Sequence, residues 1–254
     1  MFSELASMVG LSSNHLALAL AVVVIAGMVR GFAGFGLSAI VMASLVTIIP
    51  PVELIPTCFI LEGIAGLFTL RGGMRDADMK VVWGFVIGSF IGTPIGLYAT
   101  TTVDADTSRL IALLIVLGLT LAQLGKFRPS FLATNPGLYG SGVISGIAGG
   151  LASVGGMVVA LYVLASDREP KVIRASLVMF LFIGMFTPLV FLLLYNVMTV
   201  QALWRGAIFT PFVLVGVGLG ALLFRPSLVP FYKKTCLLIL VALCLVGLSR
   251  LFLS

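Results

Sequence analysis

An arginine lies inside a glycine-rich segment of the first apolar stretch. Arg30 belongs to segment 27–36, which reads GMVRGFAGFG and is flanked on both sides by apolar residues. An arginine within a membrane costs about 2.5–3.5 kcal/mol on insertion scales, so it is expected to have a function. Its planar guanidinium suits two oxygens of a sulfite, sulfonate or carboxylate group. Arg30 is therefore a candidate anion ligand; the alternative is an arginine that snorkels from the end of a helical hairpin.

The glycine spacing around Arg30 occurs a second time. Segment 142–150 reads GVISGIAGG and repeats the pattern Gly-x-x-x-Gly-(Phe/Ile)-Ala-Gly 115 residues later. A helix that stops and restarts within a membrane exposes N–H groups that favour anions, and glycine lets a ligand approach them. For any single glycine, tight packing is the simpler explanation, but two matched clusters favour a site. The expected site residues besides Arg30 are Gly31, Gly34, Gly36, Ser38, Gly146, Gly149, Gly150, Ser153 and Gly155.

One carboxylate lies well inside an apolar stretch. Glu62 is near the middle of residues 51–71. A carboxylate within a membrane can take up and release protons, or it can neutralise a buried cation. Glu62 is therefore a candidate coupling residue, and a structural ion pair with Arg30 is the equally weighted alternative.

The composition excludes most soluble classes of protein. Sixty per cent of the 254 residues are hydrophobic, nine per cent are charged, and the mean hydropathy is +1.23. A soluble domain carries about 25% charged residues. The chain is therefore expected to be an all-α polytopic membrane protein, in contact with a lipid bilayer.

Several function classes lack their motifs. Despite the net charge of +6, most cations lie in a few short connections and form no basic face, so nucleic-acid binding is not expected. The cysteines Cys58, Cys236 and Cys244 are unpaired in spacing, and no metal-ligand cluster or nucleophile motif occurs. We expect no enzyme activity, catalytic residue, metal or cofactor. Arg205 and the single histidine, His15, are interpreted as residues at the membrane interface.

The positive charges predict the topology. Clear spans are expected at 51–71, 79–100, 107–125, 171–195, 201–224 and 231–253, with longer apolar stretches at 14–49 and 137–165. A single helix of 36 residues would extend about 54 Å, too long for one crossing. Lysine and arginine collect in connections on the cytoplasmic side. Four connections carry lysine and arginine: 71–80, 126–136, 166–174 and 225–234. They fall on one side only if each long stretch is a glycine-broken helical hairpin, either fully crossing or re-entrant.

This arrangement predicts an inverted-topology repeat. Each half, residues 1–128 and 129–254, contains one broken hairpin and three transmembrane helices, and three is an odd number. The second half therefore enters from the opposite face, as in many secondary transporters. Such proteins bind substrate where the discontinuous helices of the two halves meet.

The chain also resembles a known family. The glycine-rich segments 31–36 and 146–150, the prolines at 50–51 and 170, the two similar halves and the overall length are similar to the TauE/SafE family of sulfite and organosulfur exporters. The resemblance covers nearly the whole chain. It implies transport of a sulfur-containing or related organic anion across the inner membrane of a bacterium.

Three functions are therefore weighed. The first is a secondary transporter of small anions, an exporter coupled to protons or sodium ions, and the second is a passive anion channel with the same fold. The third, a membrane scaffold, gains nothing from Arg30. Substrate, direction, coupling ion and a homo-oligomeric state are left open.

Overall fold

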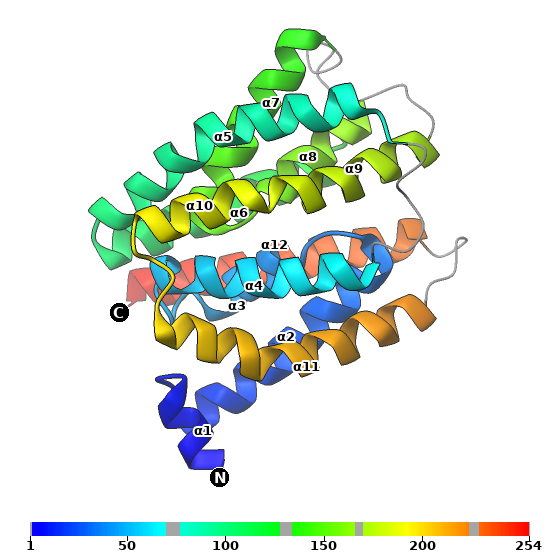
Figure 1. The fold of residues 1–254 in the computed structure, drawn as a ribbon. Coiled ribbons are helices and arrows are strands. Elements are labelled where there is room, and N and C mark those ends of the chain that lie inside the picture. Colours follow the sequence, from blue (N-terminus) through cyan, green and yellow to red (C-terminus); the bar gives the residue numbers. More distant parts are fainter. Residues whose placement is uncertain (1, 70–76, 128–133, 166–169, 224–228, 254) are drawn as a thin grey trace.

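The chain folds into a bundle of helices. The computed structural model describes residues 2–69, 77–127, 134–165, 170–223 and 229–253, and every regular element in these ranges is a helix (Figure 1). The helices are α1 (Phe2–Met8), α2 (Ser13–Ala33), α3 (Leu37–Leu45), α4 (Pro51–Thr69), α5 (Met79–Thr102), α6 (Ala105–Leu124), α7 (Asn135–Ala152), α8 (Gly155–Ala165), α9 (Pro170–Gly184), α10 (Phe186–Leu194), α11 (Val200–Leu222) and α12 (Val229–Leu253).

Six of the described helices are long and apolar enough to cross a membrane. They are α2, α4, α5, α6, α11 and α12. Many large apolar side chains on these helices point outward; Trp83, Leu222 and Phe252 are examples. Such a surface is stable in lipid and not in water. The prediction of an all-α polytopic membrane protein is confirmed.

Both long apolar stretches are divided into two helices. The first stretch breaks at residues 34–36, between α2 and α3, where Gly34 and Gly36 have φ of 79° and 94°. The second breaks at residues 153–154, between α7 and α8, where Ser153 has φ of 57°. Left-handed backbone of this kind ends a helix and turns the chain. The first break lies at the C-terminal end of segment 27–36, and the second lies three residues beyond segment 142–150.

The predicted span 171–195 differs from the structure. It consists of α9 and α10, with Met185 between them. Pro188 explains the interruption, because it has no N–H to donate to the Gly184 carbonyl and its ring crowds that carbonyl. Pro188 instead occupies the first turn of α10, where an N–H would have no partner within the helix.

Two pairs of helices pack closely through glycines. The backbone of α2 at Gly27 and Gly31 lies against α11, and the backbone of α5 at Gly92 and Gly96 lies against α7. A Cβ atom at Gly92 would fall on the carbonyl of Val143, so only glycine permits this approach. Such contacts are the usual role of Gly-x-x-x-Gly spacing between membrane helices.

The helix ends separate into two groups. In Figure 1 the starts of α4 and α11 and the ends of α5, α10 and α12 lie at the left of the bundle. The ends of α4 and α11 and the starts of α5, α9 and α12 lie at the right. The helix ends that flank two basic connections of the sequence, between α4 and α5 and between α11 and α12, therefore lie on the right.

Candidate anion site at the helix breaks

An arginine and a glutamate meet at the first helix break. Arg30, in the last turn of α2, places its Nε atom 3.1 Å from Oε2 of Glu62 on α4. Arg30 is only 4% exposed, and the Glu62 side chain is 26% exposed. The Arg30 Nε atom makes no aligned hydrogen bond to any described residue, so its contact with Glu62 is an attraction of charges. Glu62 is near the middle of α4, which places the pair deep in the bundle.

The carboxylate of Glu62 also caps the start of α3. Its Oε1 atom accepts hydrogen bonds from the backbone N–H of Ser38 at 3.3 Å and from the Ser38 hydroxyl at 3.0 Å. The residue before α3 is Gly36, which has no side chain to cap the helix. A negative charge is favourable at a helix N-terminus. Glu62 therefore provides the acceptor that a capping side chain would otherwise supply.

The second helix break forms the opposite wall of a small cavity. This cavity of about 40 Å³ lies between Arg30 and Glu62 on one side and Ser153, Val154 and Met157 on the other. One ordered water needs roughly 10–15 Å³ of such volume, so the space holds about three waters or one small ion. The two breaks, far apart in sequence, thus line one cavity.

Polar side chains of neighbouring helices hold the second break. The Thr100 hydroxyl on α5 donates to the carbonyl of Gly150 at 2.8 Å. The Ser145 hydroxyl donates to the carbonyl of Gly155 at 2.9 Å, and Gln123 Nε2 on α6 donates to the carbonyl of Met157 at 3.2 Å. These carbonyls lie around the break, where the helical pattern of bonds is interrupted. These three side chains were not predicted, because their only signal in the sequence is a polar residue in an apolar helix.

The predicted site residues fall into two sets. The cavity is lined by Arg30, Gly34, Gly36, Ser38, Glu62 and Ser153. The other predicted residues lie outside its lining: Gly31 packs against α11, Gly146 and Gly150 pack against α5, Gly155 faces Ser145, and a Cβ at Gly149 would meet no neighbour.

A second buried arginine is also paired. Arg205, near the start of α11, is 3% exposed and is therefore buried within the bundle. Its NH1 atom lies 2.7 Å from Oε2 of Glu53 on α4, and its Nε donates to the carbonyl of Val9 at 2.9 Å. Arg205 thereby joins α11, α4 and the turn after α1. We interpret it as a structural residue.

Broken helices that bring a buried arginine to a cavity inside an apolar multi-pass bundle are features of membrane transport proteins. Comparison with known families is more specific, since the family described as sulfite exporter TauE/SafE matches residues 19–247. The chain belongs to the TauE/SafE family, which confirms the resemblance found in the sequence. Comparisons with curated proteins and with solved structures found no match.

Proposed function

We propose that this protein is a secondary transporter that exports a small anion, sulfite or a small sulfonate, across the bacterial inner membrane. The anion binds in the cavity between the two helix breaks, with Arg30 as its principal ligand. The observation that carries the proposal is the position of Glu62 between Arg30 and the start of α3. Family membership supports the substrate class.

The Glu62 carboxylate and the substrate compete for the same groups. Arg30 and the N-terminus of α3 both favour a negative charge, and both are turned toward Glu62. A proton on Glu62 removes the charge of the carboxylate and frees the guanidinium and the Ser38 donors for an incoming anion. Anion binding is then linked to uptake of one proton, so the anion and a proton cross together, and the outward gradient of the anion drives export.

The surroundings of Glu62 contain few other groups that carry charge. Arg30 faces it from α2, and the thiol of Cys58 is next to it on α4. The other described residues that line the cavity, from α3, the second break, α8 and α9, are glycine, serine or apolar residues. Protonation near the anion is therefore assigned to Glu62.

The size of the cavity supports a small substrate. About 40 Å³ suits an inorganic oxyanion, whereas a larger sulfonate requires the helices around the cavity to separate. Separation of the helices is also how alternating access works in transporters with broken helices.

We also propose that residues 1–128 and 129–254 are related as an inverted repeat. Two observations support it. In the first half the broken pair α2–α3 follows the short α1, and in the second half the broken pair α7–α8 comes first. The first helix of each pair packs through glycines on a helix of the other half, α2 on α11 and α7 on α5.

Transport by protein reconstituted in liposomes tests the proposal. With an alkaline lumen and a more acidic bath, the wild type should accumulate labelled sulfite, because the proton enters with the anion, and Arg30→Ala should abolish accumulation. Arg30→Lys should restore only part of it, because lysine keeps the charge and loses the two-point geometry. Lys234→Ala, which removes an exposed cation near the start of α12, is the matched control and should behave as wild type. Full activity in a folded Arg30→Ala protein would contradict the proposal. Sulfite flux that does not depend on the pH gradient would instead favour a passive channel.

A further inference from the structure

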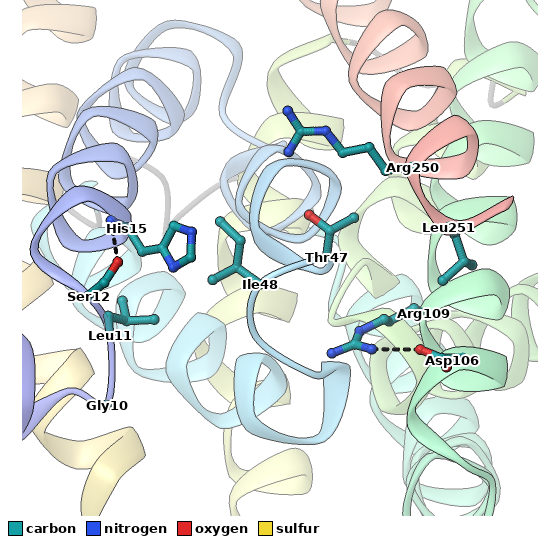
Figure 2. Close-up of a pocket in the computed structure, with 10 residues that line it drawn as sticks. All are labelled: Gly10, Leu11, Ser12, His15, Thr47, Ile48, Asp106, Arg109, Arg250 and Leu251. Atoms are coloured by element: carbon teal, nitrogen blue, oxygen red, sulfur yellow. Dashed lines mark hydrogen bonds and ion pairs between the residues drawn. The ribbon is translucent and has the colours of Figure 1, made fainter. Parts of the chain in front are cut away.

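We infer that a second cavity, at the left end of the bundle in Figure 1, binds a small oxyanion from solution. This cavity has a volume of about 480 Å³ and is lined by residues of the start of α2, the turn after α3, the start of α6 and the end of α12 (Figure 2). Small-molecule sites in proteins are about 300–1,000 Å³, so the space is large enough for a hydrated anion. It shares no lining residue with the cavity at the helix breaks.

Cationic side chains from two helices extend into this second cavity. In Figure 2 the guanidinium groups of Arg109 on α6 and Arg250 on α12 extend toward the space beside Thr47 and Ile48. His15, the single histidine of the chain, approaches from α2. The groups come from separate parts of the chain, so the fold brings them together.

The two arginines are held differently. Arg109 NH1 forms an ion pair with Asp106 at 2.6 Å, and Arg109 Nε donates to the carbonyl of Val46 at 3.1 Å. These contacts fix the orientation of Arg109 and neutralise much of its charge. Arg250 is exposed and forms no ion pair or hydrogen bond with any residue that the structure describes. Two arginines against one aspartate leave one uncompensated positive charge in the cavity.

The position of this charge is unusual for the chain. By contrast, Lys80 and Lys234 belong to the starts of α5 and α12, which lie at the right end of the bundle in Figure 1, as expected for a cytoplasmic face. The positive-inside rule therefore does not explain Arg250 at the left end. A concave surface with a net positive charge concentrates anions near it. No carboxylate of a described residue pairs with Arg250 as Glu62 pairs with Arg30, so this site is available without a proton.

We assign the second cavity a role in transport. If the inner site exports its anion toward this end of the bundle, the second cavity is the vestibule that receives the anion. This role rests on the proposed function, whereas binding of an oxyanion to the cavity does not. The same chemistry would also suit the phosphate of an anionic lipid, so the test must separate these two sources.

Calorimetric titration with sulfite tests the inference, using protein in nanodiscs of zwitterionic lipid. The wild type should show two binding events. Arg250→Gln should weaken one of them by roughly fivefold, the effect of losing one solvent-screened charge contact. Lys234→Gln, which removes an exposed charge from the opposite end of α12, is the matched control and should leave both events unchanged.

The second arm uses Arg30→Ala, which should remove one event and leave the event that depends on Arg250. Loss of only the Arg250-dependent event in nanodiscs of anionic lipid would assign the cavity to a lipid headgroup and contradict the inference. Identical titrations of the wild type and Arg250→Gln would also contradict it while leaving the proposed function intact. Sulfite binding that is lost in Arg250→Gln but unaffected by Arg30→Ala would support the inference and contradict the proposed function.

Discussion

At the scale of single residues, Glu62 explains how a buried arginine is tolerated next to a helix break. The carboxylate balances the charge of Arg30 and accepts two hydrogen bonds from Ser38. A buried ion pair is stable only when such further hydrogen bonds satisfy its members. The same contacts create a place that favours a negative charge, which a substrate anion could take from Glu62.

The backbone of the first break yields a prediction about Gly36. Its φ of 94° lies in the region that side chains rarely adopt. Gly36→Ala should therefore destabilise the protein by roughly 1–2 kcal/mol, which lowers the melting temperature by a few degrees in a protein of this size. Gly36→Asn should lose less, since asparagine adopts left-handed backbone more readily. Equal melting temperatures for Gly36→Ala and the wild type would show that the break is not held as described.

At the scale of elements, the sequence predicted that two apolar stretches would break near their glycine clusters, but not which glycines form the break. Gly-x-x-x-Gly spacing puts glycines on one helix face, and this pattern suits both close packing and ligand approach. Gly31, Gly146 and Gly150 serve packing, while the chain turns at 34–36 and 153–154. The difference depends on which neighbour a helix face meets, and a single sequence carries no record of that.

The candidate site, too, could be predicted only in part, because a single sequence does not record which residues meet. Arg30 and Glu62 were recognisable because charges are rare in apolar stretches. The structure places Nε of Arg30 3.1 Å from Oε2 of Glu62. The pairing of Arg205 with Glu53 was not predicted. Both residues are near span ends in the sequence, where an interfacial position is the simpler expectation.

The packing glycines yield a prediction with a control in the next helix. Gly92→Ala in α5 places a Cβ atom on the Val143 carbonyl, so α5 and α7 must separate. We expect it to destabilise the protein, with loss of monodispersity in detergent. Gly118→Ala in α6 meets no neighbour within 4 Å and should be neutral or stabilising, because alanine favours a helix by up to about 1 kcal/mol. Equal stability of the two variants would mean that the close contact between α5 and α7 is absent.

At the scale of the whole molecule, export requires that the two ends of the bundle face different compartments. Phe127 and Val200 are exposed residues at opposite ends, one after α6 and the other at the start of α11. The native cysteines are buried, so they give little background labelling. With a membrane-impermeant thiol reagent, Phe127→Cys should be labelled only from the cytoplasm and Val200→Cys only from the opposite side. Labelling of both from one side would overturn the topology.

The central claim is that Glu62 and the substrate anion compete for Arg30, and anion binding as a function of pH tests it most directly. The probe is methanesulfonate, which keeps one negative charge across the range used. Affinity of the wild type should rise as the pH falls, by up to about tenfold per pH unit where one proton is taken up for each anion. Glu62→Gln should bind tightly at every pH, because the neutral amide leaves Arg30 available. Glu53→Gln, which alters the Arg205 pair instead, should keep the pH dependence of the wild type. Weaker binding by Glu62→Gln at every pH, or a wild-type affinity that does not change with pH, would contradict the claim.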